Sequence, residues 1–157
     1  MEKKIKLGYG FDRMHFGLTV QQVETLLGKP DDYEKEQRFG DGPDDVMDIL
    51  YYDELGISLS FDKSNSYRMT EIMIDSPAFS LDKIKVGMEE EKVVEIAECM
   101  EIGDWYEEEL DGEGEEESAA ITFDEAGLTL WFDRGVLVSM QMSAQYDEQD
   151  NIIWPKE

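Results

Sequence analysis

The amino-acid sequence predicts an α+β fold in which two tandem helix-plus-antiparallel-sheet repeats pack into one compact unit. Three observations predict it. A sequence pattern recurs once along the chain, each copy begins with apolar residues at helical spacing, and each copy continues with stretches in which apolar and polar residues alternate. We expect the first repeat over residues 1–76 and the second over residues 77–157.

The internal repeat rests on two blocks that recur in the same order. Asp12–Thr19 recurs as Asp82–Glu89, at an offset of seventy residues. Leu50–Asp62 recurs as Ile121–Asp133, at an offset of seventy-one. Two matches at nearly one offset indicate duplication of a single structural unit.

Each copy is expected to begin with an amphipathic helix. The first helix should start at Thr19, which is a suitable N-cap, and end at Gly28, with Pro30 just beyond it. The second should start near Glu89, with further carboxylates in its first turn, where the helix dipole favours negative charge.

Six strands follow from period-two alternation, three in each copy, joined by tight turns rich in Gly and Asp. We expect them at about Val46–Tyr52, Ile57–Phe61, Met69–Ile74, Ala119–Phe123, Leu128–Phe132 and Leu137–Met142. The acidic segments between each helix and its strands are interpreted as connectors.

The charge limits the possible partners. The 157 residues include 39 Asp and Glu against 14 Lys and Arg, for a net charge of −25, while 41% are hydrophobic. Such a surface repels nucleic-acid phosphates and anionic lipids, so we expect neither nucleic acid nor membrane as a partner. It favours a basic protein, although acidity also serves solubility alone.

The single cysteine, Cys99, excludes an intramolecular disulfide and fits a reducing compartment. The basic start of the chain is not followed by an apolar segment, and no stretch is long enough to span a membrane, so a cytoplasmic protein is expected.

Little in the sequence indicates catalysis. The only histidine, His15, is far from Cys99 along the chain, and a nucleophile needs a base beside it. No calcium loop or phosphate loop is complete, so no cofactor and no metal are expected. An enzyme that uses clustered carboxylates and a metal ion stays an alternative.

Strand alternation identifies candidate binding residues. Leu130 and Phe132 occupy positions of the core pattern, and this places Trp131 on the opposite face of the strand. The same reasoning directs Tyr51, Met69 and Met73 outward. An outward tryptophan is a good contact anchor. Alternatively, the connectors or the C-terminal tail cover this face.

An acidic rim is the second candidate feature. Residues 89–117 hold 15 acidic residues and one lysine. Within this run, Glu107, Glu108, Glu109 and Asp111 are predicted to steer a cationic partner. The alternative is a solvated loop without a dedicated function.

The run Gly17–Val23, followed by Leu27–Pro30, resembles the signature of the β-lactamase-inhibitor-protein-like superfamily. In the second copy, Gly87, Val93 and Ile96 match the pattern, whereas Glu98-Cys99-Met100 replaces its ending. The resemblance implies helices laid on an antiparallel sheet, and a tandem duplication whose two sheets form one concave binding face.

These observations favour a non-enzymatic, acidic protein-binding module. An immunity or inhibitor protein that neutralises a basic toxin or enzyme fits them best. The alternative function is that of a structural or adaptor protein that self-associates through its exposed sheet.

Overall fold

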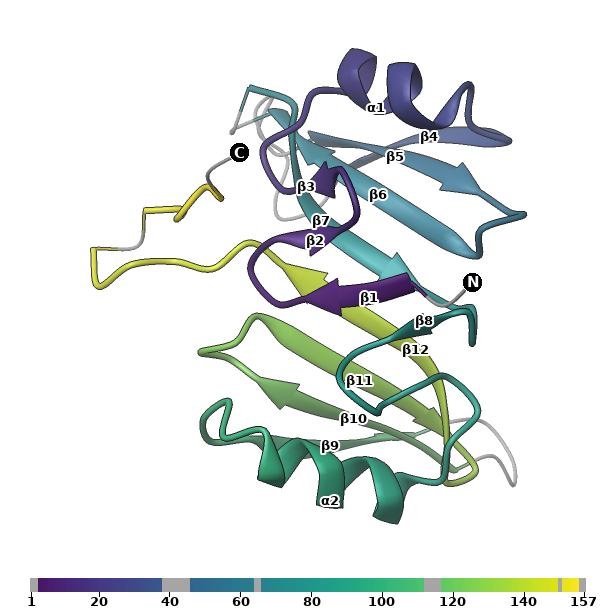
Figure 1. The fold of residues 1–157 in the computed structure, drawn as a ribbon, viewed down its shortest axis with the longest axis vertical. Coiled ribbons are helices and arrows are strands. Elements are labelled where there is room, and N and C mark those ends of the chain that lie inside the picture. The colour runs from purple at the N-terminus through teal and green to yellow at the C-terminus, as the bar shows by residue number, and fades with distance from the viewer. Residues whose placement is uncertain (1–2, 38–45, 64–65, 112–116, 150, 156–157) are drawn as a thin grey trace.

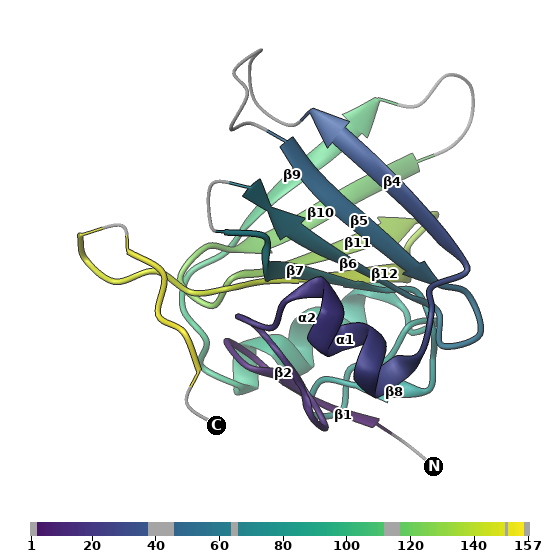
Figure 2. The ribbon, with the colours of Figure 1, turned by 90° about the horizontal axis from the view of Figure 1, so that it is seen from above.

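The computed structural model describes residues 3–37, 46–63, 66–111, 117–149 and 151–155. In this part of the chain, twelve strands form two sheets, and the helices α1 (Val20–Leu27) and α2 (Glu90–Cys99) lie on one side of the larger sheet (Figures 1 and 2).

The larger sheet has eight strands, and every neighbouring pair is antiparallel. In spatial order they are β4 (Asp32–Gln37), β5 (Val46–Tyr52), β6 (Ile57–Asp62), β7 (Arg68–Ile74), β12 (Val136–Ser143), β11 (Leu128–Asp133), β10 (Glu117–Phe123) and β9 (Tyr106–Asp111).

The smaller sheet has four short strands in the order β3 (Met14–His15), β2 (Gly10–Phe11), β1 (Lys3–Lys6) and β8 (Phe79–Ser80). β1 pairs with β8 in parallel, so the start of the chain is joined to the segment that follows β7. This small sheet lies on the same side of the larger sheet as the helices (Figure 2).

The predicted α+β class is wrong. The described part of the chain is β-rich, and its two helices have only eight and ten residues. The prediction gave too much weight to the helical signals. It also treated as connectors two acidic segments that are strands, β4 and β9.

Those two strands were missed for a physical reason. Both lie at the ends of the larger sheet, and β4 reads Asp-Tyr-Glu-Lys-Glu-Gln, without an apolar alternation. An edge strand pairs on one side only and tolerates charged residues on both faces. The small sheet was missed because its strands span two to four residues, too short for any periodicity.

The two halves of the larger sheet meet at one strand pair, β7 with β12, where Met73 lies opposite Gln141 and Ile72 lies opposite Met142. On each side of this seam, one helix is followed along the chain by four strands. Each side also has a register shift at a corresponding place, between Ser60 and Phe61 and between Trp131 and Phe132. The predicted boundary between residues 76 and 77 therefore separates halves that share one sheet.

Local signals position the helices as expected. Thr19 is the N-cap of α1, and its hydroxyl accepts a hydrogen bond from the backbone N–H of Gln22. The Gln22 side chain in turn accepts a bond from the Thr19 N–H at 2.9 Å, which completes a capping box. Gly28 ends the helix with φ 85°, so the predicted bounds are confirmed.

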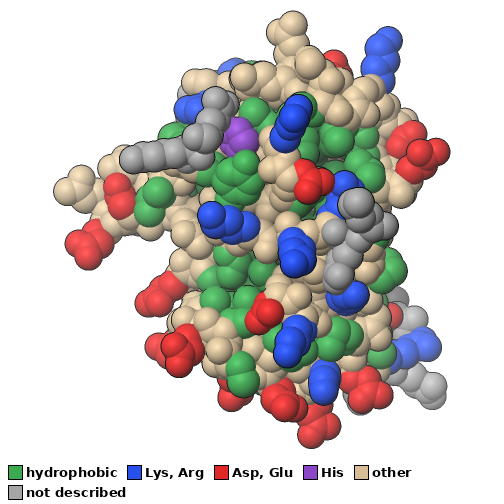
Figure 3. Space-filling model, viewed as in Figure 1, with side chains coloured by type: hydrophobic (Ala, Val, Ile, Leu, Met, Phe, Trp, Pro, Cys, Tyr) green, Lys and Arg blue, Asp and Glu red, His purple; other side chains and the backbone are tan. Residues whose placement is uncertain are grey.

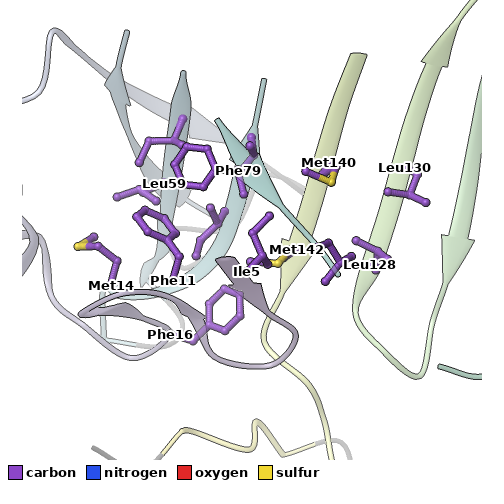
Figure 4. Packing of buried hydrophobic residues seen from close by; sticks show 14 of the residues in the cluster. Ile5, Phe11, Met14, Phe16, Leu59, Phe79, Leu128, Leu130, Met140 and Met142 are labelled. Atoms are coloured by element: carbon purple, nitrogen blue, oxygen red, sulfur yellow. The ribbon is translucent and has the colours of Figure 1, made fainter. Parts of the chain in front are cut away.

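The hydrophobic core lies between the larger sheet and the elements that cover it. The covered face carries Leu59, Leu130, Met140 and other apolar side chains with no exposed area. Figure 4 shows side chains of the N-terminal segment, including Phe11, packed on this side. The six predicted strands are confirmed to within two residues, because burial on this one face imposes the alternation that the sequence displays.

We predict that Gly10→Ala destabilises the protein by about 2–4 kcal/mol, because φ is positive there and an added Cβ would meet backbone atoms. The nearest is the Met14 carbonyl oxygen, which would lie well inside van der Waals contact with that Cβ. Gly135 also has a positive φ, but nothing lies within 4 Å of its Cβ position, so Gly135→Ala should cost only about 1 kcal/mol. Urea unfolding of both variants measures the difference, and equal losses would contradict this account of Gly10.

Candidate functional site

The face of the larger sheet opposite the helices carries the candidate site, and we call it the open face. No helix of the described residues covers it, and in Figure 2 the outer strands β4 and β9 rise away from the helices. The described part of the C-terminal tail lies on the other side of the sheet. Trp154 packs on Arg68, whose Nε donates to the Gly17 carbonyl oxygen on the helix side. The alternative was that the connectors cover this face. Parts of those connectors, residues 38–45 and 112–116, lie outside the described residues.

A row of paired residues crosses the whole open face. From β4 to β9 it consists of Asp32, Tyr51, Ser58, Met73, Gln141, Thr129, Thr122 and Tyr106. The row crosses the seam between Met73 and Gln141, so the two halves present one continuous surface.

In the first half, this surface is hollowed into a groove of about 500 Å³, which we call the open-face groove. Its apolar part includes Met47, Ile49, Tyr51 and Met73. Around these side chains lie carboxylates from three strands and their ends, namely Glu36, Asp53, Glu71 and Asp75. The described residues that line the groove include no lysine or arginine.

Tyr51 lies where the prediction placed it. Its side chain is partly exposed on the open face, and its hydroxyl donates to a carboxylate oxygen of Glu34 at 3.1 Å. Burial raises the pKa of Tyr51, and the hydrogen bond and negative charge of Glu34 raise it further. The phenol therefore stays neutral and fixed in orientation at neutral pH.

Met73 is also on the open face, but Met69 is not. Met69 is fully buried in the core, so its outward assignment is wrong. The register shift between Ser60 and Phe61 places Met69 opposite Phe61 and breaks the alternation at this point of the strand. A bulge of this kind leaves no clear sign in the sequence.

Trp131 faces the open side, as predicted, but it is only partly exposed and is hydrogen-bonded. Its indole Nε1 donates to the Gln141 side-chain oxygen at 3.0 Å, and the Gln141 amide donates to Glu71 at 2.6 Å. These bonds run from the second half across the seam to a carboxylate of the groove. Trp131 thus belongs to a hydrogen-bonded network, which the sequence alone did not reveal.

The acidic run is divided by strand pairing instead of forming one rim. Glu107 lies opposite Ile121, on the helix side, whereas Glu108 lies opposite Ala120, on the open face. Glu109 and Asp111 continue β9 through backbone pairing, and their side chains lie outside the described residues. Of this run, the structure places Glu108 on the open face, in the same cross-strand row as Ala120 and Trp131, and Glu107 on the other face.

The groove carboxylates were missed, although a signal for one of them exists. Glu71 alternates with Ile72 and Ile74 of the core, and the same period that directs Met73 outward also directs Glu71 outward. Asp53 and Asp75 each directly follow the end of a strand, and Asp53 was interpreted as part of a tight turn.

Two further observations concern cofactors and membranes. Among the described residues, no group of three or more His, Cys, Asp or Glu side chains is arranged to hold a metal ion. Neither helix of the described chain has the length and apolar character needed to cross a bilayer.

Comparison with known proteins places the chain in a family. The model of the family described as a domain of unknown function, DUF7738, matches residues 3–95. The chain belongs to this family. The match includes every described residue that lines the open-face groove, but it ends before Trp131 and Gln141. No curated protein and no solved structure matches the chain.

We predict that Met69→Ala lowers the free energy of unfolding by about 2–5 kcal/mol, because it leaves a cavity in the core. Met73→Ala is the matched control on the open face and should cost less than about 1 kcal/mol. Chemical denaturation of the two variants distinguishes the faces. A larger loss for Met73→Ala would contradict the register described for β7.

We predict that Glu90→Gln leaves the protein more stable at pH 7 than Glu91→Gln does. Both residues are in the first turn of α2, but burial and the charge of Glu107 raise the pKa of Glu90. A raised pKa means that ionisation of the Glu90 carboxyl costs folding stability. This cost is present at pH 7, decreases as the pH falls through the raised pKa, and is gone below the ordinary pKa of a glutamate. Urea unfolding from pH 7 to pH 4 should show the two variants converge, and a constant difference would contradict the assignment.

Proposed function

We propose that this protein is a non-enzymatic binding module that captures a basic protein on its open face. The observation that carries the proposal is the open-face groove, in which an apolar surface is surrounded by carboxylates. A surface of this kind fits a partner segment that presents both cationic and apolar side chains.

Charge supports a basic partner in two ways. The net charge of −25 attracts cationic proteins over long range and repels nucleic acids. Glu36, Asp53 and Asp75 are exposed at the groove, where they would give this attraction a local target. Such complementarity mainly accelerates association and selects among partners.

The apolar part of the groove would supply the short-range contacts that hold a bound partner. Methionine side chains such as Met47 and Met73 adapt to the shape of a partner, and the hydrogen-bonded ring of Tyr51 is already fixed. The bonds from Trp131 through Gln141 hold Glu71 in place. In this proposal Trp131 supports the groove, and it contacts the partner only at the margin of the interface.

An immunity or inhibitor protein that neutralises a basic toxin or enzyme in the cytoplasm fits this chemistry. The resemblance to the β-lactamase-inhibitor-protein-like superfamily points the same way, because it too implies binding on an open sheet face. Self-association through the same face is less favourable, since it would bring the carboxylates of two grooves together.

The proposal is tested with a groove variant and a matched control. The groove variant combines Glu36→Gln, Asp53→Asn and Asp75→Asn, and the control combines Glu95→Gln, Asp82→Asn and Asp104→Asn. All six side chains are exposed, and both sets remove three negative charges. Wild-type protein and both variants are used as parallel baits in a host lysate. The wild type and the control should retain the same basic protein, and the groove variant should not.

We predict that association of the purified partner slows at least about tenfold in the groove variant at low salt, and that its salt dependence becomes flatter. The control should change association much less. Met73→Ala should instead accelerate dissociation, because it removes a short-range contact. Stopped-flow and surface-binding kinetics measure both rates. Binding that is indifferent to salt and to the groove variant would contradict the proposal.

A further inference from the structure

A second hollow lies on the opposite side of the molecule, between the β2–β3 hairpin and α1. We call it the hairpin pocket. Tyr9, Arg13 and His15 line it from the N-terminal segment, Gln22 and Leu26 line it from α1, and its volume is about 440 Å³. That volume is within the range of small-molecule sites. Leu26 is 41% exposed, so this side of α1 presents an apolar surface that the fold leaves open.

Two aromatic side chains of the pocket are held in place before any ligand binds. The rings of Tyr9 and His15 contact each other at a tilt of 33°, with their centroids 5.5 Å apart. The Tyr9 hydroxyl donates to the Asp12 carbonyl oxygen at 3.2 Å, and His15 Nδ1 lies 2.9 Å from the Phe16 carbonyl oxygen. A ligand would therefore lose little affinity to the ordering of these rings.

The charge around the pocket is opposite to that of the molecule as a whole. The described residues that line it include Arg13 and no carboxylate. The nearby Asp12 forms an ion pair with Lys3 at 2.9 Å, and Lys6 lies 5.8 Å from the centre of the Tyr9 ring. Figure 3 shows the histidine on this face among basic and apolar side chains. The chain as a whole has a net charge of −25, but the local charge at this site favours an anion.

We propose that the hairpin pocket binds a small carboxylate that carries an apolar group. The carboxylate lies against the guanidinium of Arg13, whose paired N–H groups match its two oxygens. The apolar group lies on Leu18 and Leu26, beside the Tyr9 ring. Leu18 is 6% exposed and forms the base of the site. This proposal does not depend on the function of the open face.

The chemistry of the ligand is tested with four probes on the full-length protein. The probes are 3-phenylpropionate, its neutral amide, the cationic 3-phenylpropylamine, and N-acetyl-glycyl-phenylalanine with a free carboxylate. Amide resonances of the hairpin and α1 should shift saturably with 3-phenylpropionate, with a dissociation constant below about 1 mM. The amide and the amine should bind at least about fivefold more weakly.

The dipeptide distinguishes two sources of the same chemistry, a free organic acid and the carboxyl end of a peptide. Weaker binding of the dipeptide than of 3-phenylpropionate supports a free acid. If the dipeptide binds and 3-phenylpropionate does not, the free acid is overturned as the ligand. Equal binding of the acid and its amide, or no saturable shift up to about 10 mM, would overturn the anion site.

Variants test the residues named. Arg13→Gln should weaken 3-phenylpropionate about fivefold, and Lys92→Gln on α2, with the same change of charge, should leave it unchanged. Leu26→Glu places a carboxylate in the wall of the pocket and should abolish saturable binding. Arg13 on the hairpin and Leu26 on α1 are both exposed, and circular dichroism checks that the variants fold. Unchanged affinity in Arg13→Gln or in Leu26→Glu would overturn the proposed placement.

Discussion

The pairing of β7 with β12 is the contact on which the rest of the structure depends. It joins two four-stranded halves into one sheet and fixes their register, with Met73 opposite Gln141. Because side chains alternate strictly between faces, this register decides which residues meet on the open face. It also allows Gln141 to reach Glu71 at 2.6 Å, so that Trp131 and the open-face groove belong to one network. A shift of one residue at the seam would send these side chains into the core.

One-sided covering of the sheet gives the molecule two unlike surfaces. The helices and the small sheet occupy one side, and the apolar side chains between them and the larger sheet form a single core. The open face keeps the carboxylates of the groove, whereas the N-terminal segment, from β1 to β3, carries Lys3, Lys6 and Arg13 on the other side. An acidic protein therefore has a local basic surface, and partners of opposite charge would be directed to opposite sides.

The sequence allowed prediction of those parts of the fold that burial dictates. Leu59, Leu130 and the other core residues alternate because one face of each central strand is covered, and the helix bounds follow from Thr19 and Gly28. The described side chains of the edge strands are exposed on both faces, so these strands carry no such period. Tyr51, Met73 and Trp131 were correctly placed on the open face, but Met69 was not, because a bulge displaces the alternation in β7. The bond from Gln141 to Glu71 joins residues 70 positions apart and is visible only once the seam is known.

The two edge strands determine how far this sheet can grow. Among the described residues, β4 and β9 each pair with one neighbouring strand only, and an identical molecule could pair with the other edge of either strand. β4 contains Asp32, Glu34 and Glu36, and β9 contains Glu107, Glu108, Glu109 and Asp111. An approaching copy would bring carboxylates against carboxylates at each end. The acidity of these strands would therefore oppose growth of the sheet by addition of further copies.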